Sequence, residues 1–280
     1  MSTAYWHQVR SAEMKVPTDR PLADLTAELT TMLGSTDPVE RDEIAYPILA
    51  TWISEGVYDD LLAGLGDGMA TGLTQGLGES GTDSVFRRAF SVLVLAECVE
   101  RDNSETRLPA AKILEWGDRV AGWLVRERDV RGFVPDQGWA HAVAHGADAI
   151  GVLADSQHLG LNELTVLLDV VADRVVLETP APLWNGEHDR LALATMRILR
   201  RRLVPLRILE PWLARLTAAA TFSGPVGRDP FLTTGNPEAF LRALHIQVAL
   251  APEPIDVRAD LLLELIAALR ATNATYLQRT

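Results

Sequence analysis

The sequence predicts an all-α protein built from helical pairs. Apolar residues recur at helical spacing along almost all of the 280-residue chain, and stretches that alternate in the manner of a β-strand are nearly absent. Predicted helix starts also recur at nearly constant intervals. These observations favour a right-handed α-solenoid of about five HEAT-like helical pairs, in a single domain over residues 1–280. An α/α toroid is the alternative, since the same helix content allows it.

Ten segments carry the apolar pattern of an amphipathic helix. In chain order they are 22–33, 39–53, 85–99, 110–125, 139–153, 161–177, 191–204, 208–220, 237–250 and 255–269. Asp37-Pro38 and Asn236-Pro237 each place a capping residue before a proline at the first helical position, and Thr82-Asp83 supplies another cap. The glycine-rich stretch 64–81 predicts a weak helix followed by a loop.

The predicted helix starts form a repeat. They lie near Asp37, Asp83, Asp136, Glu187 and Asn236, which are 46, 53, 51 and 49 residues apart. Each interval has room for two helices and their loops, as in a helical-repeat protein. The openings 37–41 and 187–192 also resemble the acid-then-arginine starts of HEAT-like repeats.

Composition limits the kind of partner. The formal net charge is -12, which argues against general affinity for nucleic acid or for an anionic membrane. The single cysteine, Cys98, excludes an intramolecular disulfide, and it lies in an apolar helix where a core role is expected. The first 20 residues lack the apolar run of a signal peptide, so we expect a cytoplasmic protein.

The segment 138–148 is the best candidate for a functional site. If it is helical, His141, His145 and Asp148 share one face, while Trp139 points the other way. Histidine titrates near neutral pH, and a carboxylate one turn away orients the ring and favours its charged form. We therefore predict His145 and Asp148 as an acid–base pair, with His141 beside them, as the catalytic candidates.

Six further residues are predicted to bind a ligand in the same groove. Equivalent positions in stacked repeats form a line, and aromatic residues next to the site segments can wall a pocket. The six candidates are Arg87, Trp139, Trp184, Glu187, Arg190 and His245. The function predicted from them is binding of a small polar or anionic molecule, with proton transfer at the histidines as an added hypothesis.

Two other functions remain open at this stage. The chain is alternatively a protein-interaction scaffold, in which the histidines and the aspartate form a structural network. As a second alternative it is a metal-dependent hydrolase, since His141 and His145 have the i, i+4 spacing of helical metal ligands, with Asp148 or Glu187 as a third. Ala142 stands where the H-E-x-x-H motif has its glutamate, so that motif is incomplete. We expect no cofactor other than this alternative metal ion.

A family resemblance supports the choice of segments. Residues 131–135 and 138–148, with the pattern G-W-x-H-A-x-A-H-G-A-D, resemble the signature of a bacterial domain family of unknown function. The segments 41–47, 76–79, 83–88 and 186–192 are similar to it as well, so the resemblance spans about residues 40 to 200. It implies an all-helical protein and supplies no activity.

Overall fold

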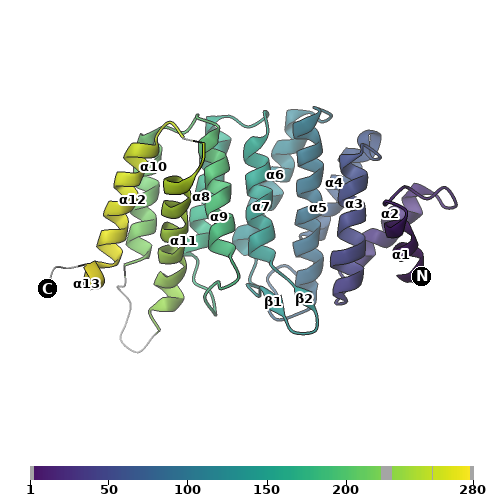
Figure 1. Ribbon diagram of the computed structural model, residues 1–280, viewed down its shortest axis with the longest axis horizontal. Coiled ribbons are helices and arrows are strands. Elements are labelled where there is room, and N and C mark those ends of the chain that lie inside the picture. Colours follow the sequence, from purple (N-terminus) through teal and green to yellow (C-terminus); the bar gives the residue numbers. More distant parts are fainter. Residues whose placement is uncertain (1–2, 222–228, 254, 278–280) are drawn as a thin grey trace. The chain divides into compact units, whose positions relative to one another are not determined.

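The computed structural model describes residues 3–221, 229–253 and 255–277, and the regular secondary structure of this part of the chain is helical apart from one short hairpin (Figure 1). The prediction of an all-α protein is therefore confirmed. By packing, the chain divides into two compact units, Met1–Ala149 and Ile150–Thr280. Whether the helical pairs form a solenoid, and whether the chain acts as one domain, stay predictions.

The N-terminal unit contains six α-helices, two short helical segments and a hairpin, and α7 runs out of it into the second unit. In order, they are α1 (Thr3–Ser11), α2 (Leu22–Met32), the π-helical η1 (Val39–Ala45), α3 (Tyr46–Ser54), the 3-10 segment η2 (Asp59–Leu61), α4 (Leu62–Gly72), α5 (Ser84–Ser104), α6 (Ala110–Arg126), β1 (Phe133–Val134), β2 (Gly138–Trp139) and α7 (Ala142–Asp155). The long helix α5 packs against α3 and α4, so it forms the centre of this unit.

The C-terminal unit continues from α7 with helices alone in its described part. These are α8 (Leu161–Val176), α9 (Glu187–Arg200), α10 (Leu206–Ala219), α11 (Phe231–Leu250), α12 (Arg258–Thr272) and α13 (Ala274–Leu277). Helix α11 packs against α8, α9, α10 and α12, so it is central here as α5 is in the first unit.

Each predicted helical segment overlaps a helix of the structure, but two predicted helix starts were wrong. Asp136 lies in the turn of the β1–β2 hairpin, with a φ of +62°. Asn236 lies inside α11, which begins five residues earlier at Phe231, whose N–H is accepted by the Asp229 side chain at 3.0 Å. Pro237 is consequently a proline in a helix interior.

Pro47 divides the segment that the sequence predicts as one helix over 39–53. A proline has no N–H, so the carbonyl of Glu43 has no partner four residues later. The preceding turn is π-helical over Val39–Ala45, and a regular α-helix continues as Tyr46–Ser54. The expected cap is present, since Asp37 Oδ1 accepts the N–H of Val39 at 2.8 Å.

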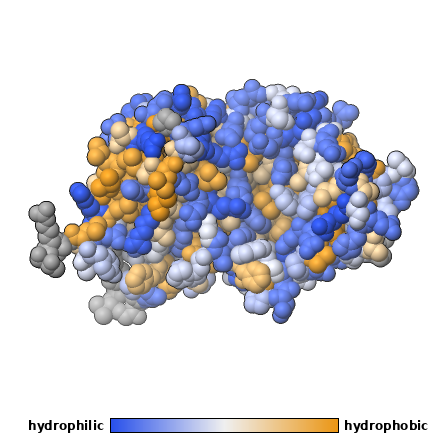
Figure 2. Space-filling view, viewed as in Figure 1, coloured by the Kyte–Doolittle hydropathy of each residue, from blue (hydrophilic) through white to orange (hydrophobic). Residues whose placement is uncertain are grey.

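Helices α11 and α12 expose apolar side chains in the C-terminal unit. Ile246, Leu250 and Leu263 are 56%, 75% and 66% exposed, and Figure 2 shows apolar residues gathered over these two helices. Within the described residues, no helix combines the length and the apolar character that crossing a bilayer requires.

Candidate functional site

His141 forms the junction between the hairpin and α7. Strands β1 and β2 pair antiparallel with Phe133 opposite Trp139, and the chain then enters the helix through His141, whose φ is +50°. Such a left-handed conformation is uncommon for a residue other than glycine. The His141 N–H donates to the carbonyl of Arg131 at 3.1 Å, and its own carbonyl accepts the N–H of His145 at 2.9 Å.

The structure brings the two predicted histidines together. Their ring centroids are 5.8 Å apart. His145 is only 7% exposed, packs edge-to-face on Phe90 at 5.2 Å, and places Nδ1 3.2 Å from the carbonyl oxygen of Ala89. Because a carbonyl only accepts, this contact assigns the proton to Nδ1 of His145. The Nδ1 side of the ring is therefore held by a hydrogen bond inside a packed environment.

Trp139 lies on the same side as the histidines, contrary to the sequence prediction. Its ring stacks on His141 with centroids 4.3 Å apart and planes 24° apart, and it is 40% exposed. The prediction was wrong because residue 139 belongs to β2, where side chains do not follow helical steps. Asp148 is half-buried on α7, one turn after His145.

Arg41, in η1, holds the turn of the hairpin by a hydrogen bond. It is fully buried, forms an ion pair with Asp42 at 2.7 Å, and donates from Nη2 to the carbonyl of Gln137 at 2.7 Å. Its guanidinium also lies over the ring of Phe86, 4.2 Å from the centroid. A charge buried in this way is compensated on every side, which indicates a positioning role for Arg41.

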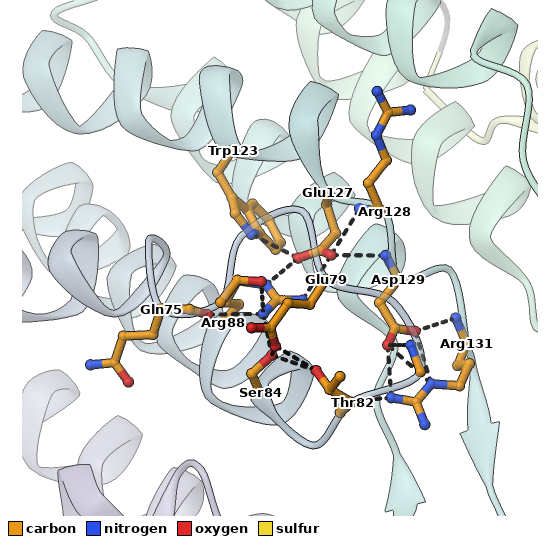
Figure 3. A network of polar contacts seen from close by, with 12 residues as sticks. Gln75, Glu79, Thr82, Ser84, Arg88, Trp123, Glu127, Arg128, Asp129 and Arg131 are labelled. Carbon is orange, nitrogen blue, oxygen red and sulfur yellow. Dashed lines mark hydrogen bonds and ion pairs between the residues drawn. The ribbon is translucent and has the colours of Figure 1, made fainter.

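A larger polar network connects α5, the end of α6 and the glycine-rich loop (Figure 3). Arg88 and Glu127 are both completely buried and form a bidentate pair, at 2.5 Å from Nε and 2.9 Å from Nη2. Glu127 also accepts the indole N–H of Trp123 at 3.1 Å. Arg88 Nη1 donates to the carbonyls of Gln75 and Gly76, both at 2.9 Å.

The same network fixes the far end of the glycine-rich loop. The buried Asp129 accepts the N–H of Gly81 at 2.9 Å and pairs with Arg131 at 2.7 Å. Arg131 in turn donates to the carbonyl of Thr82 at 2.6 Å. The loop that the sequence predicts after α4 is thus present and is hydrogen-bonded at both ends.

Arg87, one residue before Arg88, borders a hollow of about 640 Å³ within the N-terminal unit. This volume is within the range of about 300–1,000 Å³ that is typical of small-molecule pockets. The wall is formed by the C-terminal end of α2, the segment after it, and the turn after α4. Its polar lining is Thr30, Thr31, Ser35, Glu40, Gln75 and Arg87. Neither His141 nor His145 is among the described residues that line this hollow.

The guanidinium of Arg87 is only partly satisfied. Nη1 donates to the carbonyl of Thr30, at the C-terminal end of α2. Among the described residues, the buried Nε of Arg87 has no acceptor. Burial lowers the pKa of Arg87 below its usual value, and the group stays a cation because that usual value is so high. Glu40, which lines the same hollow, accepts the hydroxyl of Ser35 at 2.7 Å.

The C-terminal unit has its own hollow, of about 630 Å³, next to the start of α9. Trp184 is 78% exposed at its rim, and His188 and Asn236 line it. The buried Asn236 accepts the N–H of Leu183 at 3.0 Å and the Nε2–H of His188 at 3.3 Å, and donates to Thr179 at 3.1 Å. His188 is half-buried, and its partner Asn236 lies 48 residues further along the chain, in α11.

His188 predicts a pH dependence of stability. Desolvation lowers the pKa of His188, and the hydrogen bond to Asn236 opposes this effect. As the pH falls, the unfolded chain therefore binds the proton on His188 before the folded chain does. The contribution of neutral His188 to the free energy of unfolding is complete above about pH 6.5, the unperturbed pKa, and is lost as the pH falls through the folded-state pKa. In denaturant titrations between pH 7.5 and 5, the free energy of unfolding of His188→Gln should fall less than that of the wild type. His7→Gln, which changes an exposed side chain, should behave as the wild type, and equal pH profiles for His188→Gln and the wild type would contradict this assignment.

The remaining candidates of the C-terminal unit have separate environments. Glu187, the first residue of α9, is 1% exposed and accepts the N–H of Asn185 at 2.7 Å, a local contact with the turn that precedes the helix. Arg190 is exposed on the first turn of the same helix, and His245 is half-buried on α11. His245 does not line the hollow beside Trp184.

In the described part of the chain, no three His, Cys, Asp or Glu side chains lie close enough to hold a metal ion. The buried Cys98 has a pKa raised by desolvation, and this keeps it a neutral thiol.

Comparisons with known proteins identify the family of the chain. A family model described as "Protein of unknown function (DUF2785)" matches residues 73–246, more than half of the chain. The match confirms the expectation of a family of unknown function, and it includes the histidine segment, Arg87 and the network of Figure 3. No curated protein and no solved structure matches the chain.

Proposed function

Since the chain belongs to the DUF2785 family, whose function is unknown, we propose from the geometry of its N-terminal unit that it binds a small polar molecule with an anionic group. The ligand occupies the hollow beside Arg87, and the guanidinium binds its anionic group. Hydroxyl and amide groups of Thr30, Ser35 and Gln75 provide the neutral hydrogen bonds.

One observation carries this proposal: a half-buried arginine borders a hollow of ligand size, and the hydrogen bonds within the described residues use only its Nη1. The Nη2 group is not among the buried unpaired atoms, so it can donate a charge-assisted hydrogen bond to a carboxylate or phosphate oxygen in the hollow. Arginine also matches these anions in a bidentate manner. The contact with Thr30 alone is what a helix-capping arginine would make, but it uses only Nη1.

The histidines are not assigned to this binding site. His145 is buried and its Nδ1 faces the carbonyl of Ala89, so its described contacts favour a packing role. The backbone of His141 forms the turn into α7, and its ring stacks on Trp139. The proposal therefore concerns binding, with Arg87 retained from the sequence-based candidates and the catalytic pair left as a hypothesis.

Titration calorimetry with inorganic phosphate and acetate, in a buffer free of both anions, tests the proposal. We expect millimolar or tighter binding by the wild type, and a loss of about 10- to 100-fold in Arg87→Met, which corresponds to a hydrogen bond to a charged group. Arg87→Lys keeps the charge without the bidentate geometry and should bind with intermediate affinity.

Arg207→Met, which removes an exposed arginine of α10, is the matched control and should bind as the wild type. Circular dichroism of each variant separates loss of binding from loss of folding. Binding of both anions by a folded Arg87→Met protein with wild-type affinity would show that the site is elsewhere.

A further inference from the structure

A second hollow, apolar in its lining, adjoins the hollow of Arg87. It has a volume of about 360 Å³ and lies between α2 and α4. On α2 the lining residues include Leu22, Thr26 and Thr30, and on α4 they include Gly64, Leu65 and Gly68. Leu22, Thr26 and Thr30 are four residues apart, and Gly64 and Leu65 lie one turn before Gly68, so each helix presents one continuous face to the hollow.

Thr30 connects the two hollows, because it lines both of them. The polar hollow is also lined by the C-terminal end of α2, through Thr30 and Thr31, and by the turn after α4, through Gln75. The acidic Glu40 does not line the apolar hollow. It lines the hollow of Arg87 and also a third hollow, of about 240 Å³, together with Thr31. The polar and the apolar hollows therefore adjoin at Thr30, and the Glu40 carboxylate lines only the polar one of these two.

No charged side chain is among the described residues that line the apolar hollow. Its buried phenol, Tyr58, lies 2.8 Å from the hydroxyl of Thr26, so these two polar groups satisfy each other. Burial raises the pKa of Tyr58 to about 12, which keeps the phenol neutral. Gly64 and Gly68 supply width, since a Cβ at either position would have no atom within 4 Å.

We infer that the ligand is an anionic amphiphile, with its carboxylate or phosphate head at Arg87 and an unbranched alkyl chain between α2 and α4. The inference rests on the proposed function, because the same arginine binds the head. It adds a chemical class: a free medium-chain carboxylate or monoalkyl phosphate fills a polar hollow and an adjoining apolar one together, whereas a small anion fills the first alone.

A homologous series from acetate through butyrate, hexanoate and octanoate to decanoate, each below its micelle-forming concentration, tests the inference by titration calorimetry. Each methylene that enters the apolar hollow should tighten binding about three- to fourfold, until the hollow is full. Arg87→Met should weaken every member of the series by a similar factor, since it removes only the contact with the head.

Gly68→Leu places a side chain in the hollow at an exposed helical position, where leucine also favours the helix. We expect this variant to bind acetate as the wild type does but to lose most of the gain from chain length. Gly122→Leu is the matched control, because it fills open space at an exposed position of α6 outside the hollow, and it should keep the wild-type series.

The outcomes separate the two proposals. Equal affinities for acetate and octanoate would overturn the amphiphile and leave anion binding at Arg87 intact, whereas no binding of any member or of phosphate would overturn both. A chain-length gain that survives Gly68→Leu would overturn the assigned hollow. Binding to phosphatidylglycerol vesicles that requires Arg87, without binding of free octanoate, would replace a free amphiphile by a lipid surface.

Discussion

Glu127→Ala is expected to lower the free energy of unfolding by about 3–5 kcal/mol, the range measured when one partner of a buried ion pair is removed. The variant leaves the guanidinium of Arg88, which is 0% exposed, without the carboxylate that contacts both Nε and Nη2. The indole N–H of Trp123 loses its acceptor as well. Denaturation in guanidinium chloride, followed by circular dichroism, measures the loss.

An exposed ion pair of the same length provides the control. Arg215 and Asp173 also approach to 2.5 Å, but their side chains are 45% and 41% exposed. Water screens such a pair, so Asp173→Ala should cost less than about 1 kcal/mol. If Glu127→Ala cost no more than Asp173→Ala, burial of the Arg88–Glu127 pair would not be the source of its effect.

A double variant tests whether the cost arises from the unpaired charge. In Arg88→Met/Glu127→Leu both charges are gone and apolar side chains take their place, so part of the loss should be recovered relative to Glu127→Ala. Recovery will be incomplete, because the carbonyls of Gln75 and Gly76 lose their donor in Arg88→Met. Gln75 borders the Arg87 hollow, so the network also supports the wall of the proposed binding site.

The helices were predictable because they depend on local spacing, and the departures from that prediction have identifiable causes. The π-helical turn before Pro47 follows from one missing N–H. Asn236 fits the sequence pattern of a cap, but its side chain binds Leu183 and His188, and no local pattern reports a partner so far along the chain.

The burial of Arg88 and Arg41 could have been predicted from the sequence. Arg88 falls on the apolar stripe of α5, three residues after Val85 and four before Val92, both of which are fully buried. A charged residue at such a position requires a buried partner, so Arg88 predicts an ion pair even though the identity of Glu127 depends on the fold. Arg41, three residues before the buried Ile44, follows the same rule.

The candidate site could be predicted only in part, because some of its residues come together only in the folded chain. Arg87 was identified from its position in the predicted repeat, and it does border a hollow. Thr30 and Gln75 have no distinguishing pattern in sequence, because they reach the hollow through the meeting of α2 with the turn after α4. The histidine pair has the spacing of a functional site, yet the contacts of His145 with Ala89 and Phe90 are those of a packed residue.

Gly66→Ala is expected to destabilise the protein by about 3 kcal/mol, the upper part of the usual range for overpacking a core. A Cβ at this position would lie 2.1 Å from Cζ2 and 2.3 Å from Cη2 of Trp116. The indole cannot move away easily, because it is fully buried and its N–H donates to Asp67 at 2.9 Å.

Gly64→Ala and Gly68→Ala are the matched controls for Gly66→Ala, since all three glycines belong to α4 and a Cβ at 64 or 68 would meet nothing within 4 Å. Each should stabilise the protein by about 0.5–1 kcal/mol, through the lower conformational entropy of the unfolded chain. The opposite signs follow from geometry, because Gly66 faces α6 while Gly64 and Gly68 face the hollow beside α2. Adding Trp116→Leu should reduce the cost of Gly66→Ala, and a cost unchanged in that background would show that the indole is not what excludes a side chain at position 66.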